Sequence, residues 1–377
     1  MVTIRHGGNI RRPTSQETHR MRLVMTRVSS IFLSLAFCLW LPSSESAAET
    51  NAPNRGPVRR ARVVMVQAPN ATVTFNPQPD KIPPMIQRGL TNLTGRATPK
   101  EAWLSLISTQ DTIGLKVCST PGPTSGTRPA VVEAVVKSLL AAGLPPKQIV
   151  VWDKHLSDLR QAKFFDLAER YGVRVAGAAE AGYDEKVYYP MALIGQLVWG
   201  DLEFGKKGEG IGRNSYFSRL VTQQITKVVN ITPLLNHNLV GVSGALWGLA
   251  MSSVDNTLRF ENDPDRLASA VPEILVRPII DDRIALGDRV ALNIVDALIC
   301  QYQGEEQTML HFSVELNQLW FSTDPVALDV LSIQEIDRQR KASKVPEVKT
   351  NLELYQNAAL LEIGVSDARN IDVTRLP

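Results

Sequence analysis

Three polar segments follow apolar, strand-like runs in this sequence, and their residue types are those of acid–base and metal chemistry. Asp153 follows QIVVW, Asn236 and His237 follow KVVNITPLL, and Asp296 follows VALNIV. In open parallel sheets the carboxyl ends of the strands form the edge where ligands bind. If these strands share one sheet, an imidazole and two carboxylates converge on one crevice. Such a set suits general acid–base catalysis or a divalent metal ion.

Each of these residues also has a structural interpretation, and the sequence leaves both open. A carboxylate directly after a strand often caps the next helix or a turn, which applies to Asp153 and Asp296. His237 lies between two asparagines before a Gly-rich turn, where hydrogen bonding within the loop is the alternative. We predict His237 and Asp296 as catalytic residues, and Asp153 and Asn236 as ligand-binding residues.

Lys116 is the only charged residue in the apolar run TIGLKVC. A charge in a buried strand needs a partner or an open end. Near the carboxyl end of its strand, the amine would face a small anionic ligand, and we predict Lys116 as a third catalytic residue. The alternative is a lysine whose stem is buried and whose amine reaches solvent.

Two other motifs are weaker candidates for a functional site. The loop 205–213 (GKKGEGIGR) matches neither common phosphate-binding pattern, and a mobile surface loop is the favoured interpretation. Asp324 before Pro325 is typical of a helix start. Asp329 lies five positions on, about 140° around the helix, so the two carboxylates do not share a face.

Alternating strand and helix patterns predict the elements that position these residues. A strand at 112–118, a helix from Pro129 to Gly143, a strand at 148–152, a helix at 157–171 and a strand at 173–176 follow one another. This order predicts right-handed crossovers and an α/β fold, a largely parallel sheet flanked by helices. Residues 68–100 carry six prolines and are predicted as largely loop with one short helix. Further strands are predicted at 62–67, 227–231, 290–295 and 319–321, and further helices at 266–280, 324–340 and 352–362.

The first 48 of the 377 residues have the layout of an export signal. A basic stretch with Arg20, Arg22 and Arg27 precedes the apolar run IFLSLAFCLWL at 31–41, and Ser46-Ala47-Ala48 fits a cleavage site. The apolar run is shorter than the roughly 20 residues that span a bilayer. We therefore predict a signal peptide (1–48), a linker (49–61), one elaborated α/β domain (62–377), and a periplasmic or extracellular location.

The excess of basic residues that gives the whole chain a formal charge of +3 lies in residues 1–48. Residues 1–48 hold six Arg and two Glu, so the remainder has 35 basic and 36 acidic residues. A near-neutral domain gives no electrostatic support for nucleic-acid binding, and nothing in the sequence points to a protein partner.

Cys118 and Cys300 are the cysteines that remain after the leader, and no CxxC pair exists. An iron–sulfur cluster or a Cys-rich zinc site is therefore excluded, whereas a divalent metal held by carboxylates and imidazole stays possible. The two thiols could pair in an oxidising compartment or remain free and buried.

Four blocks of the sequence resemble the domain of unknown function 362 family: residues 113–154, 227–249, 290–298 and 321–336, the last containing STDPVALD. The resemblance implies an α/β domain of largely uncharacterised function. Some members of the family carry a ferredoxin-like cluster module, for which this chain has no cysteines. A shorter likeness, through Thr127-Arg128-Pro129, is to the nickel-pincer lactate racemase family. Arg128 is included as a candidate ligand-binding residue.

The chain departs from the family pattern at three places. Members usually have Lys-x-Asn at Lys116-Val117-Cys118, Lys-x-His at 235–237, and Lys-Asn at Trp247-Gly248. The residues retained from the pattern are Lys116, His237, Asp296, Asp324 and Asp329. The lost lysines imply a less cationic, more apolar site.

We therefore expect an exported protein with an enzyme-like polar crevice that binds a divalent metal or a small anionic ligand. The alternative is a non-catalytic periplasmic or envelope ligand-binding protein that kept the fold and lost the chemistry.

Overall fold

The computed structural model describes residues 59–191, 212–281, 283–346, 348 and 350–377, which all belong to a unit spanning Arg55–Pro377. The predicted signal peptide, most of the predicted linker and the loop 205–211 lie outside the described residues and stay predictions. Within the described ranges, no helix combines the length and the apolar character needed to cross a membrane.

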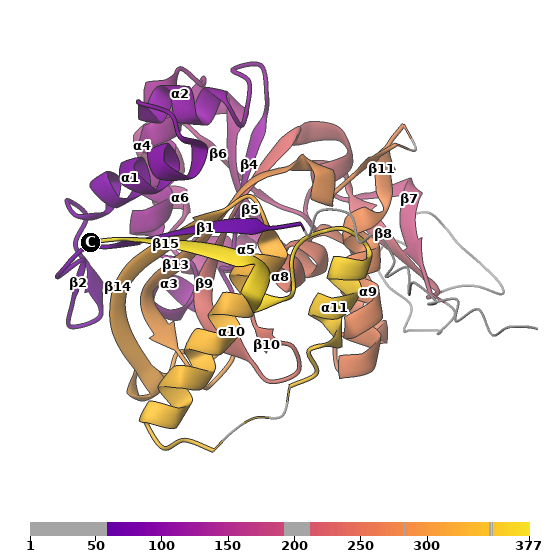
Figure 1. The fold of residues 1–377 in the computed structure, drawn as a ribbon. Helices are drawn as coiled ribbons and strands as arrows, with labels where there is room; N and C mark the ends of the chain where they lie inside the picture. Colours follow the sequence, from indigo (N-terminus) through magenta and orange to yellow (C-terminus); the bar gives the residue numbers. More distant parts are fainter. Residues whose placement is uncertain (1–58, 192–211, 282, 347, 349) are drawn as a thin grey trace, which may run out of the picture. The chain divides into compact units, whose positions relative to one another are not determined.

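A mixed, mostly parallel sheet lies at the centre of this unit (Figure 1). The strand order is β15–β1–β14–β13–β9–β4–β5–β6, and β10 pairs with the end of β9. Along that order every neighbouring pair is parallel except the two that involve β14. The predicted α/β fold is confirmed. The sheet consists of β1 (Ala61–Gln67), β4 (Ile113–Val117), β5 (Ile149–Asp153), β6 (Arg174–Gly177), β9 (Lys227–His237), β10 (Gly241–Val242), β13 (Val290–Gln301), β14 (Ser313–Ser322) and β15 (Ile371–Leu376).

In the part of the chain that the structure describes, three short antiparallel pairs lie outside the central sheet. They are β2 (Thr72–Val73) with β3 (Asn76–Pro77), β7 (Tyr183–Pro190) with β8 (Asn214–Ser218), and β11 (Pro278–Ile280) with β12 (Ile284–Ala285).

Helices cover both faces of the sheet, and successive side chains of a strand pack alternately against one face and the other. Val63 and Met65 of β1 pack into one apolar cluster, whereas Val64 and Val66 pack into the other. Because both faces are buried, the central strands are apolar along their length. On the Val64 side are α1 (Ile82–Thr94), α2 (Pro99–Leu104), α4 (Pro129–Ala142), α5 (Leu156–Gln161) and α6 (Phe165–Tyr171). On the Val63 side are α8 (Ala245–Ser253), α9 (Pro264–Val276), α10 (Pro325–Ala342) and α11 (Glu353–Leu360). The short α3 (Gly122–Ser125) lies in the connection after β4.

Several helix predictions need correction. The helix predicted at 157–171 is two helices, α5 and α6, separated by a turn in which Lys163 adopts a φ of 67°. Residues 68–100 hold α1 and the start of α2, because their prolines lie in first turns, where no N–H partner is required. The helix predicted at 266–280 is α9, which begins at Pro264, contains Pro272 and ends at Val276.

Three strands are longer than predicted. β9 continues to His237, β13 to Gln301, and β14 covers ten residues. The sequence predicts that the strand beginning at Val290 ends at Val295, before Asp296. Asp296 instead lies inside β13, in register with Pro233 of β9. Its charge can be buried there because it has a charged partner, described below.

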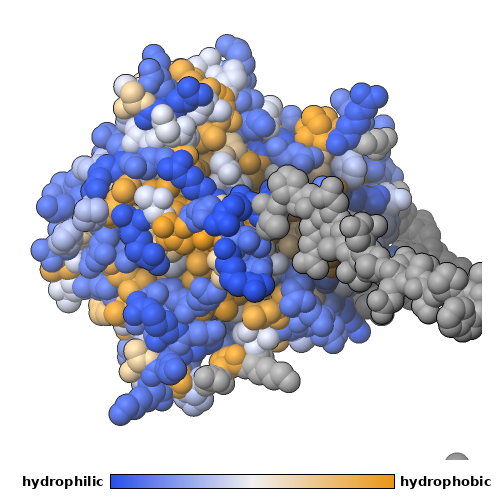
Figure 2. Space-filling view, in the orientation of Figure 1, coloured by the Kyte–Doolittle hydropathy of each residue, from blue (hydrophilic) through white to orange (hydrophobic). Residues whose placement is uncertain are grey.

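Hydrophilic residues cover much of the face shown in Figure 2, with smaller hydrophobic areas between them. Large apolar side chains that are exposed in the described ranges include Leu258 near α9, and Leu352, Leu360 and Leu361 at the two ends of α11. Exposed apolar residues are usual on protein surfaces.

Candidate functional site

Lys116 and Asp153 form a buried ion pair at the carboxyl ends of neighbouring strands. Lys116 precedes the last residue of β4, and Asp153 is the last residue of β5. The Lys116 Nζ lies 3.1 Å from Asp153 Oδ1 and also donates to the backbone oxygen of Val117. Nζ is 5.9 Å from the centroid of the Trp152 ring. The single charge in the apolar strand therefore has a partner, as its burial requires.

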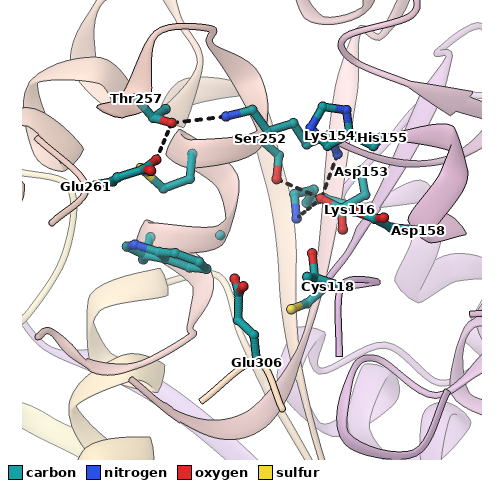
Figure 3. Close-up of a pocket in the computed structure, with 14 residues that line it drawn as sticks. Lys116, Cys118, Asp153, Lys154, His155, Asp158, Ser252, Thr257, Glu261 and Glu306 are labelled. Carbon is teal, nitrogen blue, oxygen red and sulfur yellow. Dashed lines mark hydrogen bonds and ion pairs between the residues drawn. The ribbon is translucent and has the colours of Figure 1, made fainter. Parts of the chain in front are cut away.

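Asp153 is the centre of a hydrogen-bond network that joins three segments (Figure 3). Its Oδ2 accepts from the backbone N–H and the hydroxyl of Ser119, each at 2.7 Å. Its Oδ1 accepts from the Ser252 hydroxyl at 2.7 Å and the Lys154 N–H at 2.8 Å. Burial alone would raise the pKa of Asp153, but the Lys116 ammonium and these hydrogen bonds hold it below its ordinary value. The carboxylate is ionised at neutral pH and fixes α8 against β4 and β5.

A cavity of about 170 Å³ opens beside this pair, and we call it the sheet-edge pocket. Figure 3 shows one wall formed by a chain in which Lys154 donates to the Thr257 hydroxyl and Thr257 donates to Glu261. Burial lowers the pKa of Lys154, and the nearby Glu261 carboxylate opposes that shift. The pocket is lined by Lys116, Cys118, Thr120, Asp153, Lys154, His155, Asp158, Trp247, Gly248, Met251, Ser252, Thr257, Glu261 and Glu306.

Carboxylates outnumber cationic side chains in this lining. The charge of Asp153 neutralises that of Lys116. The remaining charged residues are one cation, Lys154, and three carboxylates, Asp158, Glu261 and Glu306. Burial raises the pKa of Glu306, and the surrounding carboxylates, Asp153 foremost, raise it further. The electrostatic potential in the pocket is therefore negative.

His237 lies in an adjoining cavity of about 790 Å³, the outer pocket, which shares Trp247, Glu261 and Glu306 with the sheet-edge pocket. The ring centroids of His237 and Trp247 are 4.7 Å apart. The Nδ1 atom of His237 accepts the backbone N–H of Leu239 at 3.2 Å, which assigns the proton to Nε2. Burial lowers the pKa of His237, so the ring is neutral and offers a hydrogen-bond donor.

Asn236, the other residue predicted at the end of β9, is buried and supports a loop. Its Nδ2 donates to the Asn238 side chain at 3.2 Å, and its Oδ1 accepts the backbone N–H of Glu305 at 3.1 Å. It lines neither the sheet-edge pocket nor the outer pocket. Its contacts hold the loop that carries Glu305 and Glu306.

Asp296 and Arg128 pair with each other, and neither lines the sheet-edge pocket or the outer pocket. The Arg128 Nη1 lies 2.9 Å from Asp296 Oδ1, and the Arg128 backbone N–H donates to Oδ2 at 3.0 Å. Both side chains are almost completely buried. The structure thus brings Lys116 and Asp153 together and places His237 in the adjoining pocket. Asp296 joins the start of α4 to β13.

Asp324 and Asp329 each hold a chain segment in place. Asp324 caps α10, as predicted, by accepting the Ala327 N–H. Asp329 accepts the backbone N–H groups of Ala245 at 2.7 Å and Leu246 at 3.0 Å, at the start of α8. A Cβ at position 244 would lie 2.2 Å from Asp329 Oδ1, so only glycine permits this approach.

The buried Asp329 makes stability depend on pH. Burial raises its pKa to about 7, whereas the side chain of an unfolded Asp has a pKa of about 3.9. Between these values the folded chain holds a proton that the unfolded chain has released, so its contribution to stability falls as pH rises. The slope is at most about 1.4 kcal/mol per pH unit. Urea unfolding from pH 4 to 8 should show a weaker decline in Asp329→Asn than in the wild type. An unchanged slope in this variant, with the exposed Asp367→Asn as control, would contradict the assignment.

Cys118 lines the sheet-edge pocket as a protonated thiol. Burial raises its pKa to about 12, and the Asp153 carboxylate adds to the shift. Cys118 and Cys300 are both free and buried, which decides between the two states left open by the sequence. Within the described ranges, no group of three or more His, Cys, Asp or Glu side chains is arranged to hold a metal ion.

Four charged residues of the pocket were not predicted from the sequence: Lys154, Asp158, Glu261 and Glu306. Lys154 and Asp158 could have been suspected because they follow Asp153 closely at a strand end. Glu261 and Glu306 lie in irregular segments far from that strand, and no local pattern marks them.

Comparisons with known proteins identify the family to which this chain belongs. A model of the domain of unknown function DUF362 matches residues 113–334, more than half of the chain, and the chain belongs to this family. No curated protein matches the sequence. A crystal structure of a protein from Thermotoga maritima, determined by a structural genomics consortium, is similar at 11% identity with a TM-score of 0.35. The similarity covers 71% of this chain and 60% of that one, so the chain spans less than two thirds of its length.

Proposed function

We propose that this protein binds a small organic cation, an amine, in the sheet-edge pocket. The excess of carboxylates in the pocket lining carries the proposal. Lys116 is already neutralised by Asp153 at 3.1 Å. A ligand therefore meets Asp158, Glu261 and Glu306, none of which forms an ion pair within the described part of the chain.

Trp247 supports a cationic ligand. Its indole lines both pockets beside the carboxylates, and an ammonium group is attracted to the face of an indole ring. The family resemblance implies Lys-Asn where this chain has Trp247-Gly248, so a cation has been replaced by an aromatic ring. The proposal departs from the anionic ligand expected from Lys116, because that expectation assumed an unpaired amine.

The chemistry of the side chains favours binding over catalysis. The Nδ1 atom of His237 is occupied by a backbone N–H, and the Cys118 thiol stays protonated. A general base or a thiolate nucleophile would need the opposite. We therefore adopt the non-catalytic alternative, a ligand-binding protein. The proposal also includes an exported location, which residues 20–48 indicate.

A thermal-shift screen of the purified chain tests the ligand class. Putrescine and agmatine are the amine probes, phosphate and lactate the anions, and Mg²⁺ and Mn²⁺ the metals. A ligand at 100 times its Kd adds about 2.7 kcal/mol of stability, so an amine should raise the unfolding midpoint by several degrees. A shift with anions or metals and none with amines would overturn the proposal.

A steric variant locates the binding. A Cβ at Gly248 would approach nothing closer than Lys116 Nζ, at 3.8 Å, so a side chain there projects into the pocket. Gly248→Leu should keep the midpoint of the free protein and lose the amine-dependent shift. Ala141→Leu, which adds the same side chain to an exposed position of α4, should keep the shift. Loss of the shift in both variants, or in neither, would place the amine elsewhere.

A further inference from the structure

The outer pocket continues the sheet-edge pocket and gives a bound amine room to extend. The sheet-edge pocket has a volume of about 170 Å³, below the range of about 300–1,000 Å³ that is usual for small-molecule sites. The outer pocket adds about 790 Å³, and Trp247, Glu261 and Glu306 line both cavities. A ligand whose ammonium group lies in the sheet-edge pocket can therefore extend along Trp247 into the outer pocket.

His237 provides the outer pocket with a hydrogen-bond donor that no part of the protein uses. The residue is 9% exposed, and its Nδ1 accepts the Leu239 backbone N–H, which leaves the proton on Nε2. Within the described ranges, Nε2 has no hydrogen-bond partner, yet it is not one of the unpartnered side-chain atoms that are sealed from solvent. The Nε2–H group is therefore accessible to a ligand in the outer pocket, which His237 lines.

The surroundings of this donor indicate what kind of group it meets. The ring centroids of His237 and Trp247 are 4.7 Å apart, so a ligand chain that follows the indole out of the sheet-edge pocket reaches His237. Among the described residues, no lysine or arginine lines the outer pocket, whereas Glu261, Glu305 and Glu306 do. These carboxylates repel an anionic acceptor. The acceptor for Nε2–H is therefore a neutral oxygen.

We propose that the ligand is an amine whose chain carries a secondary amide, as in a mono-acylated diamine, and that His237 Nε2 donates to the amide carbonyl. This inference rests on the proposed function, because the ammonium group of the same ligand occupies the sheet-edge pocket. The amide also supplies an N–H, for which Glu305 and Glu306 offer acceptor oxygens in the outer pocket. An ester lacks that donor, and a second ammonium group lacks the acceptor that Nε2–H requires.

Calorimetric titration of the full chain with N-acetylputrescine, butylamine and putrescine tests the inference. Butylamine is the matched ligand, since it has the same four-carbon chain and a single ammonium group but no amide. We expect N-acetylputrescine to bind at least about tenfold more tightly than butylamine, because its amide adds hydrogen bonds in the outer pocket. Equal affinities of the wild type for these two ligands would overturn the inference.

The variant His237→Phe assigns the contact to this side chain. It keeps an aromatic ring beside Trp247 and removes the donor. We expect it to bind N-acetylputrescine at least about fivefold more weakly and to bind butylamine as the wild type does. His311→Phe makes the same substitution at an exposed histidine that lines neither pocket, and it should leave both affinities unchanged. An unchanged affinity of His237→Phe for N-acetylputrescine, or an equal loss for both ligands, would overturn the assignment.

The outcomes separate the amide contact from the amine site on which it depends. If butylamine and putrescine bind and the acetamide adds no affinity, the amide is rejected and the amine site is retained. If none of the three ligands binds, both are rejected. The comparison of N-acetylputrescine with butylamine uses the wild-type chain, so it decides the question even if His237→Phe does not fold.

Discussion

Asp296→Ala is expected to lower the free energy of unfolding by about 3–5 kcal/mol, the range for removing one partner of a buried ion pair. The substitution leaves the Arg128 guanidinium buried without its carboxylate, 2.9 Å away in the wild type. It also removes the acceptor of the Arg128 backbone N–H at the start of α4. Urea unfolding monitored by circular dichroism measures the effect.

Two controls separate an uncompensated charge from a general loss of packing. The double variant Arg128→Met/Asp296→Leu removes both charges and should recover most of the lost stability. Asp367→Ala removes one partner of the exposed pair with Arg369 and should have no measurable effect. If Asp296→Ala costs no more than Asp367→Ala, the structural role assigned to the buried pair is wrong.

Asp153→Ala is expected to destabilise the protein more than Lys116→Met does, although the two substitutions break the same ion pair. Without Asp153, the buried Lys116 ammonium keeps only the Val117 oxygen and the Trp152 ring. The loss should reach about 3–5 kcal/mol. Without Lys116, Asp153 keeps its hydrogen bonds from Ser119, Ser252 and Lys154, and the loss should be about 2 kcal/mol.

The pH dependence of Lys116→Met provides a second measure. The Lys116 ammonium opposes the effect of burial on Asp153, so its removal raises the pKa of that carboxyl. A folded-state pKa above the unfolded value lowers stability as pH rises through the interval between them. The deficit of Lys116→Met relative to the wild type should therefore be larger at pH 7 than at pH 4. Equal losses for the two variants, or the reverse order, would contradict the asymmetry.

Local patterns predicted the part of the fold that carries the Lys116–Asp153 pair. The run from β4 through α4 to β5 alternates strand and helix with short connections, which specifies a right-handed crossover and parallel pairing. Once those strands are neighbours, residues at their carboxyl ends must lie close together. Lys116 and Asp153 could be placed at one edge for that reason.

Asp296 shows where this reasoning fails. A carboxylate after an apolar run predicts the end of a strand, but β13 continues past Asp296. The strand tolerates the charge because Arg128, 168 positions earlier, neutralises it. A pairing at that separation leaves no local signature in the sequence.

The charge of the pocket could not be predicted for a related reason. Lys116 alone favours an anion, but the potential in a cavity depends on every charged group around it. Glu261 and Glu306 come from irregular segments that only the tertiary fold brings near Asp153. Lys116 alone therefore predicts an anionic ligand, whereas the proposed amine depends on carboxylates that no sequence motif marks.

The central claim, that carboxylates of the sheet-edge pocket hold an organic cation, is tested most directly by calorimetric titration of putrescine. The wild type is compared with Glu261→Gln/Glu306→Gln, and with Glu169→Gln, an exposed carboxylate of α6, as control. We predict an affinity at least tenfold lower in the double variant, about 1.4 kcal/mol, and an unchanged affinity in the control. Equal affinity in the wild type and the double variant, or binding of phosphate in place of putrescine, would contradict the account.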